Sequence, residues 1–115
     1  MPHIIIEYSQ ESVPLTALKP WVGNAFDAVK STGLFKTENI KVRVHPVMEY
    51  RLGVQNVGFV HVMCRIHVGK TEVQKLLLSQ SLLIALQHGI SRSVVITVEV
   101  IEMDEMSYSK KLPSI

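Results

Sequence analysis

Cysteine is nearly absent from this chain, and its scarcity limits the sites that the chain can build. Cys64 is the only cysteine among 115 residues, so no intrachain disulfide can form and no thiol-rich metal spacing occurs. The histidines likewise lack ligand spacing of the HExxH kind. We therefore expect no metal site, and a chain without disulfides is typical of the cytoplasm.

The sequence also lacks long apolar runs and an amino-terminal targeting segment. No run of 18 apolar residues could cross a membrane, and no basic stretch followed by an apolar one and a cleavage site opens the chain. We therefore expect no membrane partner, and we expect "MPH" to start the mature protein. Because 115 residues leave little room for several domains, we expect one domain over residues 1–115.

Charged residues are scarce as well. They make up 19% of the chain, below the roughly 25% usual for soluble domains, and the mean hydropathy is positive at +0.23. The formal net charge of +2 is spread along the chain, which argues against a nucleic-acid partner. So little polar material indicates that a single copy does not stay fully exposed to water.

Apolar periodicity predicts four strands and two helices. The strand-like segments are 3–8, 39–50, 59–68 and 93–103. Apolar residues spaced by three and four predict one helix over 14–32 and another that begins at a capping box of Thr71 and Gln74 and ends at Gly89. The apolar face expected for the second helix consists of Val73, Leu76, Leu77, Leu83, Ile84 and Leu86. The tail after residue 103 is expected to be ordered only where something holds it.

These elements form an internal repeat. Each half, about 2–50 and 57–103, reads strand, helix, strand, and a right-handed crossover would return each helix to a parallel neighbour. We therefore expect two consecutive βαβ units that form a four-stranded mixed sheet with two helices on one face. The segments "HIIIEY" and "VVITVEVI" are interpreted as apolar on both sides, so we expect other copies of the chain to cover the second face.

Pro2 raises the question of chemistry at the amino terminus. Removal of Met1, usual before a small residue, would leave Pro2 with a free secondary amine whose ring holds the nitrogen in place. Ordinary amino termini have a pKa of about 7.7 to 8.0, and burial or neighbouring cations lower it, so the amine could serve as a general base. Read alone, however, the residue is better explained as a proline that starts an edge strand, where no backbone donor is needed.

Three basic residues supply the charge that an acidic substrate would need. Lys41 and Arg43 share one face of a strand, and Lys70 in "VGKT" lies at the mouth of the second helix, whose first amides would add donors for an anion. Each of the three, taken singly, could instead be a solvated surface residue.

Three further residues have competing interpretations. Cys64 lies on the valine face of its strand, so we expect it in the core rather than as a nucleophile. Tyr50 and Trp21 could shape a pocket, although the place of Trp21 on its helix favours packing.

Several segments together resemble a known family. They are "MPHIIIEYS", "STGLF" at the end of the first helix, "IKVRVH" and "FVHVMCRIHVGKT", set within the two βαβ halves. In order and spacing, over nearly the whole chain, they are similar to 5-carboxymethyl-2-hydroxymuconate isomerase of the tautomerase superfamily. The resemblance implies an α+β, tautomerase-like fold, a homotrimer with its sheets turned inward, and an isomerase that needs no cofactor.

The resemblance also implies a reaction. Pro2 would act as general base and shift a proton in an unsaturated 2-keto or 2-hydroxy dicarboxylate such as 5-carboxymethyl-2-hydroxymuconate, a compound of aromatic catabolism. Lys41 and Lys70 stand where the family carries arginines that bind carboxylates, and both are assigned as catalytic; Arg43 is retained and is assigned to substrate binding. A lysine keeps the charge but loses the bidentate fork of an arginine, so these departures leave the exact substrate open.

Two alternatives remain open at this point. The chain could be a tautomerase of another enol acid, such as a phenylpyruvate-like one. It could also be a non-catalytic trimeric module that only binds a small anion, in which case replacing Pro2 would change nothing.

Overall fold

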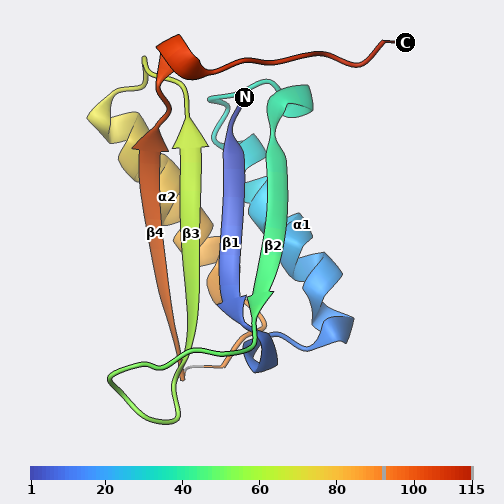
Figure 1. Cartoon of the computed structure of the whole chain (residues 1–115), viewed down its shortest axis with the longest axis vertical. Helices are drawn as coiled ribbons and strands as arrows, with labels where there is room; N and C mark the ends of the chain where they lie inside the picture. Colours follow the sequence, from blue (N-terminus) through green and yellow to red (C-terminus); the bar gives the residue numbers. More distant parts are fainter. Residues whose placement is uncertain (92, 115) are drawn as a thin grey trace.

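The computed structural model describes residues 1–91 and 93–114 as a sheet with two helices against one face (Figure 1). The strands are β1 (His3–Ser9), β2 (Lys41–Val47), β3 (Gly58–Ile66) and β4 (Val94–Glu102), and the helices are α1 (Leu15–Ser31) and α2 (Glu72–Gln87). Short 3-10 turns occupy Gln10–Ser12, Thr37–Asn39 and Glu105–Ser107. All six predicted elements are confirmed, with bounds shifted by a few residues; the last residue of the predicted tail, Ile115, lies outside the described residues.

The sheet is mixed, with strand order β2-β1-β3-β4. β1 pairs in parallel with β2, β3 pairs in parallel with β4, and β1 and β3 meet antiparallel in the centre. Each parallel pair is connected through a helix because parallel neighbours need a crossover. The predicted βαβ units, joined through their first strands, are therefore confirmed, as is the α+β class.

One end of the sheet collects chain segments that are far apart in the sequence. In register, Lys41 of β2, His3 of β1 and Arg65 of β3 lie side by side, and Ile101 of β4 continues this row. We call it the Pro2 end, since Pro2 directly precedes β1. Figure 1 shows the amino terminus and the segment after β4 at this same end.

The core lies between the sheet and the helices. Trp21 of α1 packs edge-to-face on Tyr8, with ring centroids 5.6 Å apart, and its Nε1–H donates to the Leu86 carbonyl oxygen at 3.1 Å. Trp21 is therefore a packing residue, and Cys64 is fully buried in the core, as expected. Among the described residues, no helix has both the length and the apolar character needed to cross a bilayer.

The local signals at the two ends of α2 are confirmed. Thr71 Oγ1 accepts the Gln74 N–H at 3.1 Å, and Gln74 Oε1 accepts the Thr71 N–H at 2.9 Å, which completes the capping box. Gly89 follows the helix with φ 81°, in the left-handed region that favours glycine.

The face that α2 buries differs from the predicted one. The fully buried side chains are Leu78, Leu82 and Leu86. Of the predicted face only Leu86 is fully buried, whereas four members are between 45% and 78% exposed: Val73, Leu76, Leu77 and Ile84. The prediction was wrong because leucine and isoleucine occupy several sides of this helix, so that spacing alone does not identify the side that faces the sheet.

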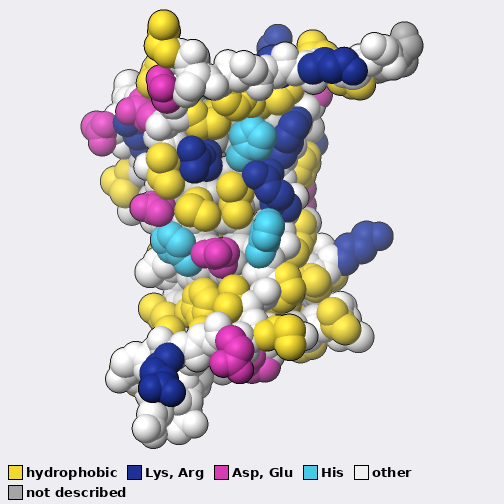
Figure 2. Space-filling view, in the orientation of Figure 1, with side chains coloured by type: hydrophobic (Ala, Val, Ile, Leu, Met, Phe, Trp, Pro, Cys, Tyr) yellow, Lys and Arg dark blue, Asp and Glu magenta, His cyan; other side chains and the backbone are white. Residues whose placement is uncertain are grey.

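The other face of the sheet is open within one copy and carries mixed side chains (Figure 2). Glu7 of β1 lies between His45 and His61 in register, and His61 contacts Glu99 of β4 through Nε2 and Oε1 at 3.1 Å. Apolar side chains are present too, such as Val95, which is 49% exposed. The expectation that β1 and β4 are apolar on both sides was therefore only partly right.

Candidate active site

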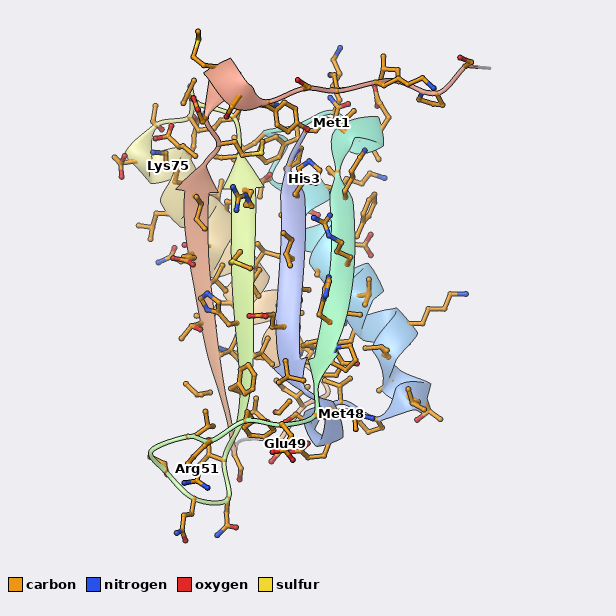
Figure 3. All side chains as sticks on the ribbon, in the orientation of Figure 1. Met1, His3, Met48, Glu49, Arg51 and Lys75 are labelled. Carbon is orange, nitrogen blue, oxygen red and sulfur yellow. The ribbon has the colours of Figure 1, made fainter. Side chains whose placement is uncertain are left out.

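Pro2 is held at the start of an inner strand. Its side chain is buried, and its carbonyl oxygen accepts the Lys41 N–H at 3.1 Å, so the parallel ladder between β1 and β2 extends to the amino terminus. Figure 3 labels its two sequence neighbours, Met1 and His3, at this end of the sheet. Because β1 lies between β2 and β3, the alternative that Pro2 opens an edge strand is wrong. The ladder instead fixes the backbone on which the Pro2 nitrogen sits.

The amino group at this end of the chain is disfavoured in its charged form. Burial lowers the pKa of the Met1 amino group, and the positive charges of Lys110 and Lys41 lower it further. Lys70 adds a smaller effect in the same direction, and the negative charge of Glu105 opposes it. Burial and this surplus of positive charge together shift the amine toward its neutral form.

The structure brings the three predicted cations to the Pro2 end of the sheet. Lys41 is the first residue of β2 and pairs with His3 in register. Arg43, two residues further on the same open face, places Nη1 3.4 Å from His3 Nδ1. Lys70 lies between β3 and α2, with its Nζ 5.3 Å from the centre of the Phe35 ring, a cation–π distance.

The segment after β4 lies across the same end and is held there by Tyr108. The Tyr108 hydroxyl is 3.1 Å from His3 Nε2, and the Tyr108 ring stands edge-to-face against His67, with ring centroids 4.7 Å apart. Glu105 in turn contacts His67, with 2.8 Å between Oε1 and Nδ1. These contacts hold the first part of the tail beside His3, at the same end of the sheet as the amino terminus.

Three residues at the Pro2 end escaped the sequence analysis: Arg65, Tyr108 and Lys110. Arg65 lies beside His3 only because of the antiparallel register of β1 and β3, which alternation alone does not reveal. Tyr108 and Lys110 belong to a tail without periodicity. An aromatic residue close to two lysines was the only available signal.

Cys64 and Tyr50 contribute nothing at this end. Burial raises the pKa of the Cys64 thiol to about 12, so the thiol stays protonated and is no nucleophile. Tyr50 follows β2 at the opposite end of the sheet, stands edge-to-face against Phe59 with ring centroids 5.2 Å apart, and donates its hydroxyl hydrogen to Glu11. Tyr50 does line a cavity, of about 770 Å³, but that cavity is remote from Pro2.

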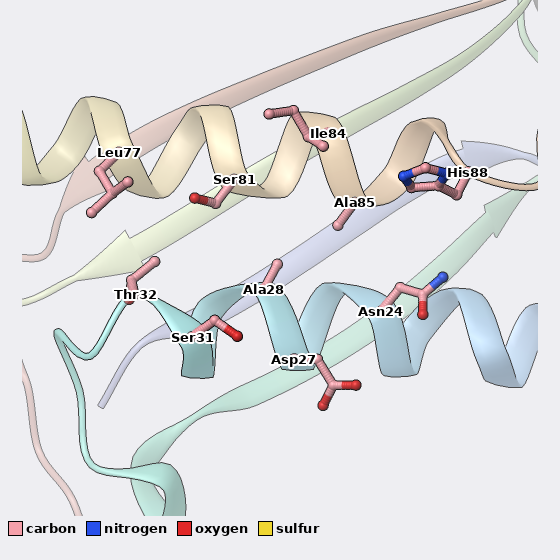
Figure 4. Close-up of a pocket in the computed structure, with 10 residues that line it drawn as sticks. All are labelled: Asn24, Asp27, Ala28, Ser31, Thr32, Leu77, Ser81, Ile84, Ala85 and His88. Carbon is pink, nitrogen blue, oxygen red and sulfur yellow. The ribbon is translucent and has the colours of Figure 1, made fainter.

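A groove of about 680 Å³ between α1 and α2 is also separate from the candidate site (Figure 4). Its lining includes Asp27 and His88 but none of the predicted site residues. Within residues 1–91 and 93–114, no three His, Cys, Asp or Glu side chains are grouped so that they could hold a metal ion.

Comparisons with known proteins agree with this fold. A family model described as 5-carboxymethyl-2-hydroxymuconate isomerase matches residues 2–113. The crystal structure of a 5-carboxymethyl-2-hydroxymuconate delta-isomerase superposes with a TM-score of 0.83 at 18% identity, covering 98% of this chain and 89% of that chain. A 5-carboxymethyl-2-hydroxymuconate isomerase from Deinococcus radiodurans R1 gives 0.81 at 22% identity, covering 96% and 88%.

The description of another solved structure with a similar fold names an oligomeric assembly. It is a fused 4-OT wild type symmetric trimer, with a TM-score of 0.69 at 15% identity, covering 87% of this chain and 85% of that chain. At these identities the solved structures show the fold alone. No curated protein sequence matches the chain significantly.

Proposed function

This chain belongs to the 5-carboxymethyl-2-hydroxymuconate isomerase family and is an isomerase, and from that premise we propose that Pro2 is the general base of a cofactor-free proton shift. The observation that supports it most is the position of Pro2, buried at the start of an inner strand beside Lys41 and Lys70. After removal of Met1 the Pro2 nitrogen becomes the amino terminus and meets the same cations, which favour its neutral, basic form.

The proposed reaction balances without a cofactor. The neutral Pro2 nitrogen removes a proton from the carbon next to the 2-keto group, and the electron pair left behind forms a dienolate. The protonated amine then returns the proton at a distant carbon of the conjugated chain, which moves the double bond and restores the base. Lys41 and Lys70 stabilise the dienolate oxygen or hold a carboxylate, and Arg43 binds a carboxylate.

The proposed substrate is an unsaturated 2-keto or 2-hydroxy acid with more than one carboxylate. 5-Carboxymethyl-2-hydroxymuconate fits this class and carries three, two on the muconate chain and one on the carboxymethyl arm. Within the described part of the chain, Lys41, Arg43 and Lys70 form no salt bridge with a carboxylate. Their charges are therefore available to an acidic ligand.

We also propose that the active form is a homotrimer in the cytoplasm. The support is the fused 4-OT trimer, whose description names that assembly and whose fold is the same. The open face of the sheet adds to it, because apolar side chains such as Val95 stand there beside charges of both signs. Neighbouring copies would cover this face and bury its apolar side chains. Such burial fits the low content of charged residues in the chain.

A panel of enol acids followed by ultraviolet absorbance tests the substrate class. We expect kcat/KM for hydroxymuconates to exceed that for phenylenolpyruvate by about 10- to 100-fold, because each extra carboxylate gains charge-assisted hydrogen bonds. Activity on the monocarboxylate but none on hydroxymuconates would make the chain a tautomerase of another enol acid. Anion binding without turnover of any compound would make it a binding module.

The pH profile of kcat/KM tests the electrostatics of the base. Because burial and the neighbouring cations lower the pKa of the terminal amine, we expect activity to rise with pH through a limb that lies below the range of ordinary amino termini. The Lys110→Gln variant removes a positive charge that disfavours the protonated amine, so its limb is expected to move to higher pH. Lys111→Gln is the matched control, and an equal shift in both variants would contradict the assignment.

A further inference from the structure

A cavity of about 460 Å³ opens on the sheet face beside the proposed base. Its polar lining consists of His3, Arg43, Arg65, Asp104, Ser107 and Tyr108. The three strands β2, β1 and β3 contribute the first three of these side chains, and the segment after β4 contributes the others. Since His3 directly follows Pro2, the cavity and the proposed base are neighbours.

The cavity has a surplus of positive charge. Arg43 and Arg65 stand on the two sides of β1, and neither makes a salt bridge with a carboxylate among residues 1–91 and 93–114. The one carboxylate in the lining, Asp104, is engaged by its own segment: its side chain accepts the Met106 N–H at 3.1 Å and the Ser107 hydroxyl at 2.8 Å. Within one copy, the two guanidinium groups therefore keep their charge available to an anion.

The hydrogen bonds of His3 leave one further donor in the cavity, the hydroxyl group of Tyr108. A guanidinium can only donate, so the contact of 3.4 Å between Arg43 Nη1 and His3 Nδ1 makes Nδ1 the acceptor. The proton of the neutral ring then sits on Nε2 and is donated to the Tyr108 hydroxyl oxygen at 3.1 Å. Burial and the charge of Arg43 lower the pKa of His3, which favours this neutral form. The Tyr108 O–H remains free to donate to a ligand.

We propose that Arg43, Arg65 and Tyr108 form a carboxylate-binding subsite, which holds a second carboxylate of the substrate while its reacting carbon lies at Pro2. The subsite rests on the proposed function and deepens it, because it makes the enzyme selective for acids with more than one carboxylate. Two arginines offer the bidentate forks that Lys41 and Lys70 lack. Arg65 is thus a specificity-determining residue, supplied by β3 and unrelated to the lysines of the proton shift.

Steady-state kinetics of Arg65→Ala test the subsite. With 2-hydroxymuconate we expect KM to rise about 10- to 100-fold with kcat nearly unchanged, and with phenylenolpyruvate we expect both constants to stay as in the wild type. Arg65→Lys should fall between the wild type and Arg65→Ala. Arg51→Ala, in the loop at the opposite end of the sheet, is the matched control and should change nothing. Equal losses for both substrates, or none for either, would overturn the subsite.

Binding without turnover separates this proposal from that of the catalytic base. Calorimetric titration with adipate, a saturated six-carbon dicarboxylate, should show weaker binding to Arg65→Ala than to the wild type or to Arg51→Ala. That result supports the subsite even if Pro2 proves not to be the base. Indistinguishable binding to all three proteins, including no binding, would overturn it. So would an Arg65→Ala protein that no longer assembles in sedimentation, since Arg65 would then belong to a contact between copies.

Discussion

An amino-terminal extension that leaves Pro2 inside a peptide bond is expected to lower kcat about 10²- to 10⁴-fold, the contribution typical of a general base. An amide nitrogen has no basic lone pair, whereas the free secondary amine does. The Pro2 side chain is buried and its carbonyl oxygen accepts the Lys41 N–H, so an extension would start from a fixed point at the proposed site. The measurement is kcat on a hydroxymuconate, with intact mass to establish that Met1 is absent from the active sample.

The variant Pro2→Ala separates the contribution of the free amino group from that of the proline ring. Alanine also permits removal of Met1 and leaves a free amine, but the chain end regains the rotation that the proline ring forbids. We therefore expect a large loss in kcat that is smaller than that of the blocked chain, with assembly unchanged in sedimentation. An extended protein as active as the free one would refute the base, and an unchanged Pro2→Ala protein would point to the binding module.

Leu82→Ala is expected to have the largest effect on stability, a loss of about 2 to 5 kcal/mol in the free energy of unfolding. Leu82 is fully buried between α2 and the sheet, so truncation leaves a cavity that its neighbours fill only in part. Ile84, two residues away on the same helix, is 60% exposed and gives the matched control. Ile84→Ala should stay within about 0.5 kcal/mol of the wild type.

Denaturant unfolding at one protein concentration measures both variants, since assembly makes stability depend on concentration. Comparable losses in Leu82→Ala and Ile84→Ala would mean that α2 buries both of its apolar stripes, as it would if another molecule covered the outer one.

The elements of the fold were predictable because each has a local signal. The "HIIIEY" run indicates a strand whatever surrounds it, and the Thr71 side chain caps α2 through residues only three positions away. The buried side of α2 was not predictable in the same manner. Its leucines present apolar surface in several directions, and only the position of the sheet decides that Leu78, Leu82 and Leu86 face inward.

The residues of the candidate site also fall into those with a local sequence signal and those without one. Pro2, Lys41 and Lys70 stand in short motifs that could be recognised one at a time, and the structure places them at one end of the sheet. Arg65 and Tyr108 carry no such motif. Arg65 joins the site through the pairing of β1 with β3, and Tyr108 joins it through a contact with His3 that spans 105 positions of the chain. Properties of this kind exist only once the strands have found their register.

That span of 105 positions has a consequence for the order of events during synthesis. The ribosome makes the amino terminus first and Tyr108 near the end, so Met1 stands uncovered while most of the chain is still being added. An aminopeptidase has this interval to remove Met1. Once β3 has paired and Tyr108 has reached His3, the tail is fixed next to the scissile bond, and we expect the removal of a remaining Met1 to become slower.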